Sequence, residues 1–241
     1  MNVTFHKLSY LMACCAALLL LSACVKKVEA PEGPPKPAWT MSNYDKFDPE
    51  TFTSHIPANT RINTRFMDFP LLNAAVFYET NRQRMLNGLK PFEHSPALEK
   101  AAQEHSQDMV DLNFFSTDSP QEGRQNLKER VAKIGIDNAT LGENLAIGFV
   151  LEYEAGKSVF TPKQNKGYFS YKHKGKPIPN HTYLSAARAV VGFWMTAQGN
   201  RAHFLNPDLT YLGVGGALFT ENEVWEKLKF TQIFSSEKGK E

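Results

Sequence analysis

Cysteine is almost absent from this chain of 241 residues. The three cysteines, Cys14, Cys15 and Cys24, all lie within the first 24 residues. Without further cysteines the rest of the chain can form no disulfide, so a hydrophobic core must stabilise it. An apolar content of 42%, with 17 Phe, is sufficient for such a core.

The chain has no large excess of positive or negative charge. It also lacks a sequence motif of a catalytic serine. It carries 27 Lys and Arg against 25 Asp and Glu, so its net charge of +2 indicates no nucleic-acid partner. No Gly-x-Ser-x-Gly sequence occurs, and Ser106, Ser119 and Ser185 have no context that resembles a nucleophile elbow. The glycine run 213–216 is followed by no helix, so a strand explains it better than a phosphate-binding loop.

The first 24 residues have the pattern of an export signal. One charge, Lys7, precedes an apolar run at 8–20 that is shorter than the ~20 residues of a spanning helix. The sequence Leu21-Ser22-Ala23-Cys24 that follows resembles the bacterial lipobox. The resemblance implies cleavage after residue 23, acylation (including palmitate) of Cys24, and a membrane-anchored lipoprotein of the cell envelope. Val25, the residue after this cysteine, resembles that of lipoproteins sent to an outer membrane, which would be the location if the organism is Gram-negative. The alternative is an ordinary secretion signal with chance cysteines.

Two segments without regular periodicity follow the signal. Residues 24–40 contain four prolines, which favours an extended tether of about 50 Å at ~3.1 Å per residue. Residues 41–69 carry scattered aromatic side chains and are predicted to form an irregular strap that lies on the domain. We therefore divide the chain into a signal (1–23), a tether (24–40), a strap (41–69) and a domain (70–236).

The domain has the pattern of an α+β fold. Helical periodicity begins at Pro70 and Ser95-Pro96, continues through a short stretch that Gly135 ends, and returns near Thr182. The segments 211–219 and 228–234 have the composition of strands. Helices on both faces of a small antiparallel sheet would bury these apolar stripes, which predicts a three-layer α-β-α sandwich.

Several motifs occur in a recognisable order along residues 70–235. They are Asn81-x-x-Arg84-x-x-x-Gly88-Leu89-x-Pro91, His105-Ser106-x-Asp108-Met109, Phe115-Ser116-Thr117-Asp118, Gly142-Glu143-Asn144-Leu145-Ala146, Trp194-Met195, Gly199-Asn200-Arg201, Leu205-Asn206-Pro207 and Gly213-Val214-Gly215. In this order the set resembles the CAP superfamily of cysteine-rich secretory, antigen 5 and pathogenesis-related proteins. The resemblance implies the same α-β-α sandwich.

The family's cleft usually holds two His and two Glu, which can bind a divalent metal. By resemblance these positions fall on Thr117, Glu143, Ala197 and Asn200, so only Glu143 is kept. Thr and Asn are poor substitutes for imidazole at zinc, so we expect no zinc and no other cofactor. His203 could approach the cleft if a helix continues there, or it is a surface or packing residue. His105 lies on an apolar stripe and is predicted to be a hydrogen-bonded core histidine.

An insertion at about 151–180 separates the Gly-Glu-Asn motif from the last predicted helix. Its stretch from Lys157 to Lys176 contains six lysines and no acidic residue. Asn165-Lys166-Gly167 predicts a hairpin turn. The functional interpretation is a mobile basic flap that binds anionic lipid, glycan or peptidoglycan; the alternative is a solvated hairpin whose aromatic residues pack on the domain. Its candidate contact residues are Phe160, Tyr168, Phe169, Tyr171, Lys172 and Lys174.

Two functions are compatible with these features. The first is a lipid-anchored envelope protein that binds a glycan or peptidoglycan fragment, a lipid or a protein without catalysis, through Glu143, Thr117, Asn200 and His203. The second is a hydrolase of peptidoglycan or peptide with Glu143 as general base and His203 as its helper. Glu122 could pair with Glu143 as in glycosidases, but nothing in the sequence places it there.

Overall fold

The domain is built on a four-stranded sheet with the strand order β1-β3-β4-β2. The computed structural model describes residues 37–240, so the signal, Cys24 and the tether up to Lys36 lie outside the described residues. The strands are β1 (Glu93–His94), β2 (Leu141–Phe149), β3 (Tyr211–Glu221) and β4 (Trp225–Ser235). The two-residue β1 runs parallel to β3, whereas the other pairs are antiparallel. The sheet is therefore mixed, which corrects the antiparallel prediction at one edge.

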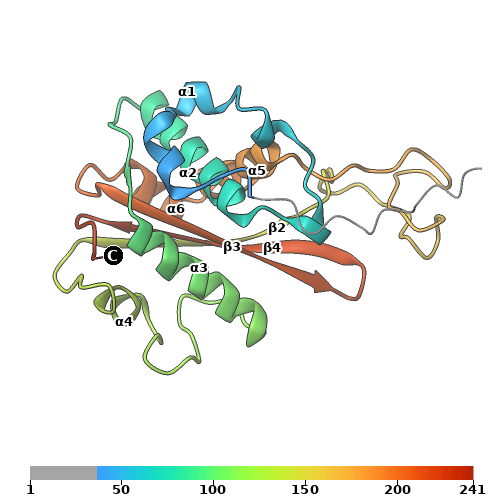
Figure 1. The fold of residues 1–241 in the computed structure, drawn as a ribbon. Helices are drawn as coiled ribbons and strands as arrows, with labels where there is room; N and C mark the ends of the chain where they lie inside the picture. The colour runs from blue at the N-terminus through green and yellow to red at the C-terminus, as the bar shows by residue number, and fades with distance from the viewer. Residues whose placement is uncertain (1–36, 241) are drawn as a thin grey trace, which may run out of the picture. The chain divides into compact units, whose positions relative to one another are not determined.

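Helices cover both faces of this sheet, as Figure 1 shows. On one face lie α2 (Phe69–Leu86), α5 (Tyr183–Thr196) and α6 (Gln198–Leu205); on the other lie α3 (Pro96–Asp111) and α4 (Leu127–Ala132). The predicted α+β class and its three layers are confirmed. Within residues 37–240, none of the helices has the length and apolar character needed to cross a membrane.

The helices begin and end where the local chemistry of the sequence favours it. Ser95 accepts a hydrogen bond from the Leu98 amide at 3.1 Å and starts α3, and Thr182 starts α5 with a reciprocal bond to Ser185. Gly88 and Gly135 follow α2 and α4 with φ of 73°, a conformation in which glycine is favoured.

The strap is more structured than the sequence predicts. It contains the short helices η1 (Met41–Lys46), α1 (Pro49–Phe52), η2 (Pro57–Asn59) and η3 (Thr64–Phe66). Phe52 stacks on Tyr78 of α2 at 4.4 Å between ring centroids. Trp39, which the sequence assigns to the tether, is 1% exposed within the same aromatic cluster. The packed part of the chain therefore includes this residue, because its indole supplies apolar area that the strap needs to dock.

Helix α3 lies unusually close to β3. A Cβ atom on Gly213 would be 2.1 Å from the Glu99 amide nitrogen, and one on Gly215 would be 2.2 Å from that of Gln103. Only glycine allows two backbones to approach this closely. The Gln103 side chain also donates to the Gly216 carbonyl at 2.9 Å and accepts from the Gly216 amide at 3.1 Å. One side-chain amide thus satisfies both main-chain groups of Gly216, beyond the end of β1.

The insertion at 151–180 is an irregular excursion rather than a regular hairpin. Isolated antiparallel bridges join Leu151 to Asn180 and Phe160 to Ser170. The predicted turn is present, with Lys166 and Gly167 at φ of 55° and 93°. In Figure 1 the excursion, coloured yellow to orange, projects past the end of the sheet.

Candidate functional site

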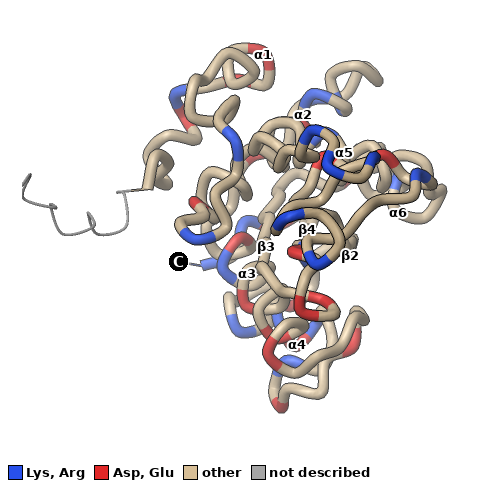
Figure 2. Tube along the Cα trace, turned by 90° about the vertical axis from the view of Figure 1, so that its right-hand side faces the viewer, with Lys and Arg blue, Asp and Glu red and all other residues tan. Residues whose placement is uncertain are grey.

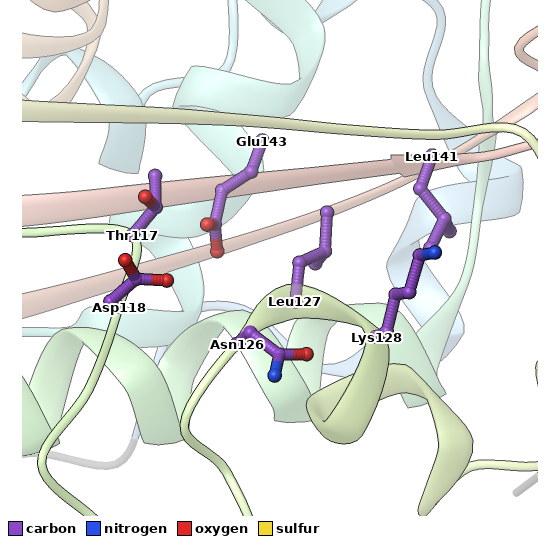
Figure 3. A pocket seen from close by; sticks show the side chains of 7 residues that line it. All are labelled: Thr117, Asp118, Asn126, Leu127, Lys128, Leu141 and Glu143. Atoms are coloured by element: carbon purple, nitrogen blue, oxygen red, sulfur yellow. The ribbon is translucent and has the colours of Figure 1, made fainter.

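An open pocket of about 450 Å³ lies between β2, α4 and the loop that joins α3 to α4. Its lining is formed by Thr117, Asp118, Asn126, Leu127, Lys128, Leu141 and Glu143 (Figure 3). The loop contributes Thr117 and Asp118, α4 begins at Leu127, and β2 contributes Leu141 and Glu143. Leu127 lies between the polar end at Glu143 and the end formed by Leu141 and Lys128 (Figure 3).

The central ion pair of the pocket joins Glu143 to Arg130 of α4. The Arg130 Nη2 atom lies 2.7 Å and 2.8 Å from the two carboxylate oxygens of Glu143, and the side chains are 1% and 4% exposed. Such a pair is held away from water, where charge-assisted hydrogen bonds are strong. Both oxygens of the one acidic residue kept from the family's set are therefore engaged by an internal cation.

Arg130 also binds the main chain of the loop that borders the pocket. Its Nη2 donates to the Thr117 carbonyl at 3.0 Å, and its Nη1 donates to the Arg124 carbonyl at 3.2 Å. Arg124 in turn binds Asp108 of α3 at 2.8 Å. The guanidinium thus ties α4, β2 and the loop together, while its Nε is buried without a protein partner among the described residues.

Burial controls protonation in this layer. It raises the pKa of Glu143 to about 7, against the opposing effect of Arg130. His105 of α3 is fully buried, and burial together with the nearby Arg130 charge lowers its pKa to about 4. His105 is therefore neutral at pH 7, with its Nε2 donating to the Ser116 carbonyl at 3.1 Å. The predicted hydrogen-bonded core histidine is confirmed.

The four predicted cleft residues do not share one pocket. Thr117 and Glu143 line it together. His203 of α6 instead lies over Gly142, where an added Cβ would be 2.7 Å from its ring, and binds the Asn144 side chain at 2.8 Å. Asn200 contacts β2 through its carbonyl oxygen, which accepts from Asn144 at 3.2 Å.

The pleat of β2 explains this separation. Successive side chains of a strand point to opposite faces, so Gly142 and Asn144 face α6 whereas Glu143 faces α4. His203 therefore cannot act as a helper to Glu143, and the grouping of Asn200 and His203 with Thr117 and Glu143 is corrected. Burial beside α6 also lowers the pKa of His203, which suits a neutral packing residue.

Among residues 37–240, no three His, Cys, Asp or Glu side chains lie close enough together to hold a metal ion. Thr117 offers only a hydroxyl beside Glu143, and the Glu143 oxygens already accept from Arg130. The residues present do not fit the two-His, two-Glu arrangement that the resemblance implies.

Sequence reasoning missed Arg130, which organises the pocket. It stands in a charged stretch, Lys128-Glu129-Arg130, on a short helix whose apolar side is marked by Leu127 and Val131. A charged side chain in such a helix is usually solvated, so spacing alone gave no signal of burial. Asp118 and Lys128 were also missed, because a loop position and a helix start become neighbours only in the folded chain.

Comparison with protein families now identifies the domain. The family model "CAP: Cysteine-rich secretory protein family" matches residues 77–234. The chain belongs to the CAP family. The match spans α2 to β4, so it includes both helical layers, the pocket and the insertion of this CAP domain.

Two curated proteins of Bacillus subtilis (strain 168) are similar to this CAP protein. The uncharacterized protein YkwD is 31% identical over 146 residues, which cover 59% of this chain and 42% of YkwD. The uncharacterized membrane protein YlbC is 29% identical over 136 residues, covering 56% and 29%. The chain thus matches less than half the length of either relative.

Two solved structures are also similar to this chain. An extracellular protein containing an SCP domain from Bacillus anthracis has a TM-score of 0.48 at 22% identity, covering 73% of this chain and 44% of that one. An outer surface protein from Borrelia burgdorferi has a TM-score of 0.44 at 15% identity, covering 73% of this chain and 97% of that one.

Proposed function

We propose that this CAP protein is a lipid-anchored component of the bacterial cell envelope that binds a small polar ligand in the Glu143 pocket without hydrolysing it. The observation that carries the proposal is the Arg130–Glu143 pair. A general base must be free to accept a proton from a water or substrate, but both Glu143 oxygens already accept from Arg130. The pocket is therefore suited to binding, while its Glu143 carboxylate is engaged in an internal ion pair with Arg130.

The free groups of the pocket suggest the chemistry of the ligand. Within the described part of the chain, the side chains of Thr117, Asp118 and Lys128 have no hydrogen-bond partner in the protein. They offer a hydroxyl, a carboxylate and an ammonium group beside the apolar side chains of Leu127 and Leu141. A ligand with amide, amine and carboxyl groups on a partly apolar frame matches this set, and a peptide-bearing fragment of peptidoglycan has these groups.

Calorimetric titration of residues 36–241 with a muramyl peptide tests this proposal. These residues form one compact unit. We expect binding in the native protein and about tenfold weaker binding in Asp118→Asn, since a lost charged hydrogen bond contributes about 1.5 kcal/mol. Asp137→Asn, which changes an exposed carboxyl group outside the pocket, is the matched control. Equal affinity in both variants, or no binding to the native protein, contradicts the pocket assignment.

The second candidate function is hydrolysis with Glu143 as general base, and one observation favours it. A carboxyl group with a pKa of about 7 is suited to exchange protons near neutral pH. Incubation with the same muramyl peptide, followed by chromatography, separates the two functions. Product formation that disappears in Glu143→Gln would establish hydrolysis, whereas unchanged ligand supports binding alone.

The anchor and the envelope location belong to the same proposal and are supported by the lipobox-like sequence at Leu21–Cys24. Two or more acyl chains hold a protein firmly on a membrane, so the native protein should stay with the membrane fraction in high salt. We expect Cys24→Ser to move into the soluble fraction of the envelope. Sedimentation of Cys24→Ser with membranes would contradict acylation at this cysteine as the anchor.

A further inference from the structure

The most uneven distribution of charge in the chain lies on the insertion. Residues 155–207 contain no Asp or Glu, and six lysines are concentrated between Lys157 and Lys176. This basic loop, residues 157–176, projects past the end of the sheet in Figure 1. Figure 2 views the molecule from that end, with Lys and Arg in blue. Five of the lysines, at 163, 166, 172, 174 and 176, have no carboxylate within ion-pair distance among the described residues.

The base of this loop is fixed to the domain. Phe169 is 7% exposed and packs on Trp225 with 4.2 Å between ring centroids. Arg61 of the strap donates to the Asn180 carbonyl at 2.6 Å, and the Ile62 amide donates to the His181 carbonyl at 2.8 Å. These contacts fix the base of the loop to the domain and do not support the predicted mobility of the flap.

The tip of the loop is also organised, around the buried Asn165. Its side-chain amide donates to the Ser170 hydroxyl at 2.6 Å, and its side-chain oxygen accepts from the Lys174 amide at 2.5 Å. These bonds hold the two sides of the tip together. The lysines are consequently presented by an ordered scaffold, which reduces the entropy lost when they bind a partner.

Two of these lysines occupy backbone positions that disfavour lysine. Lys166 and Lys174 have φ of 55° and 56°, in the left-handed region where glycine and asparagine are more stable. Local folding preference therefore does not account for lysine at either position.

An aromatic side chain accompanies the charges. Phe160 is 36% exposed and lies 5.6 Å from the His173 ring, whereas Phe169 is buried and the Tyr171 hydroxyl accepts from the Glu154 amide at 2.7 Å. Of the predicted flap aromatics, Phe160 is the most exposed, since Tyr168 and Tyr171 are half-buried and Phe169 is buried. An exposed aromatic ring among cations is typical of segments that sit at the headgroup level of a membrane.

We propose that residues 157–176 dock on an anionic membrane surface, with the five lysines on lipid phosphates and Phe160 at the headgroup boundary. Electrostatic attraction supplies most of the affinity, and Phe160 distinguishes a lipid surface from a soluble polyanion. The site is separate from the Glu143 pocket and does not depend on the ligand proposed there.

Co-sedimentation of residues 36–241 with vesicles tests this docking. We expect binding to vesicles of 3:1 phosphatidylcholine and phosphatidylglycerol at 20 mM salt, little binding to phosphatidylcholine alone, and strong weakening at 150 mM salt. Binding weakens because the Debye length shortens to ~8 Å at 150 mM salt, so the lysines then attract the lipid phosphates only at short range. Equal binding to both vesicles, or binding to neither, overturns the proposal. Binding to purified cell-wall polymer but not to vesicles overturns it in favour of a glycan partner.

The lysines at positive φ provide a variant that should not unfold the protein. Lys166→Asn with Lys174→Asn removes two charges and places asparagine where the backbone favours it, so we expect thermal stability at least equal to the native protein. Vesicle affinity should fall about 25-fold, from roughly fivefold for each of the two lysines. Lys90→Asn with Lys100→Asn changes two exposed lysines elsewhere and should leave binding unchanged. Equal losses in the two double variants would show only a net-charge effect and overturn the docking site.

Phe160→Ser tests the second element of the site. We expect reduced vesicle affinity and an unchanged dependence on salt, because the lost contact is apolar rather than ionic. Unchanged affinity in Phe160→Ser would overturn the assignment of Phe160 to the headgroup boundary. Asp118→Asn in the pocket should bind vesicles normally, which separates a failure of this site from a failure of the pocket.

Discussion

The two faces of the sheet are packed in different ways. The face under α2, α5 and α6 carries a large apolar core that includes Trp194, Phe204 and Phe230, all at most 1% exposed. The face under α3 and α4 has a small cluster around Leu98 and Ile233, beside buried charged and polar groups. The first face is stabilised chiefly by apolar burial. The second combines close backbone contact with an ion-pair network.

The pocket lies on the more polar face, and this location has a physical reason. A network of Arg130, Glu143 and the loop carbonyls holds its atoms in defined directions, whereas an apolar core fixes shape but directs few hydrogen bonds. Both faces therefore contribute to stability, the first through apolar burial and the second through close backbone contact and buried polar bonds, and the pocket lies on the second. Four experiments sharpen or break this contrast.

The largest effect is expected from adding a methyl group to β3 toward α3. Gly215→Ala places a Cβ 2.2 Å from the Gln103 amide nitrogen, which backbone movement alone can relieve, so we expect a loss of at least about 5 kcal/mol. Gly216→Ala is the matched control because its Cβ meets the flexible Leu72 side chain on the other face at 3.2 Å. The control should cost about 1 kcal/mol or less. Urea unfolding of both variants measures the difference, and similar losses would contradict the close approach of α3.

The next largest effect is expected at the buried ion pair. Arg130→Met leaves the Glu143 carboxylate buried without its cation and should reduce the free energy of unfolding by about 3–5 kcal/mol at pH 8. Arg130→Met with Glu143→Leu removes both charges and should recover much of that loss. The experiment is a double-mutant cycle by urea unfolding, with Glu143→Leu as its other single variant. A cost below about 1 kcal/mol for Arg130→Met would show that the pair does not organise this face.

A smaller effect concerns the dependence of stability on pH. The pKa of His105 falls from 6.5 to about 4 on folding, so its contribution is complete above pH 6.5 and is lost as pH falls to 4. The loss amounts to about 3 kcal/mol at ~1.4 kcal/mol per pKa unit. Glu143 has the opposite effect on stability. Its pKa is about 7 in the folded state and 4.5 in the unfolded state, so the folded state binds a proton at higher pH and gains stability as pH falls from 7 to 4.5.

Replacing His105 isolates its part of this balance. His105→Gln keeps a donor for the Ser116 carbonyl but cannot titrate, so its stability should fall less between pH 6.5 and 4 than that of the native protein. Urea unfolding at several pH values measures both slopes. His173→Gln, on the exposed basic loop, is the control. An unchanged slope in His105→Gln would mean that His105 is not held neutral by the polar face.

The smallest effect is expected where the faces should not differ. Ser95 starts α3 on the polar face and Thr182 starts α5 on the apolar face, each through a hydrogen bond to the third residue of its helix. We expect Ser95→Ala and Thr182→Ala to cost about 1 kcal/mol each, because a cap is a local interaction. Thermal unfolding can compare them. A much larger cost for Ser95→Ala would assign additional weight to its bond to the Lys238 carbonyl.

Sequence reasoning succeeded where the determining chemistry is local. Ser95-Pro96 and Thr182 mark helix starts because a side-chain oxygen binds an amide three residues away. It missed β2, where Gly142-Glu143-Asn144 reads as a polar motif rather than a strand. That segment is extended because all nine of its residues pair with β4, more than seventy positions away in the chain.

The site was predictable only in part for the same reason. Glu143 and Thr117 were found through a family resemblance, and the structure places both in one pocket. Arg130 was not found, because its burial depends on the loop and β2 closing around it. His203 was grouped with Glu143, because a chain position does not reveal on which side of a strand a neighbouring helix lies.

The Gln103 side chain has a consequence for how this protein behaves among its own copies. An edge strand with unpaired amides and carbonyls can pair with a strand of another molecule and begin aggregation. Beyond the two residues of β1, Gln103 occupies the amide and carbonyl of Gly216, and Asn73 steadies it with a bond of 3.1 Å. One glutamine side chain therefore blocks this position of the edge strand from pairing with a strand of a second molecule.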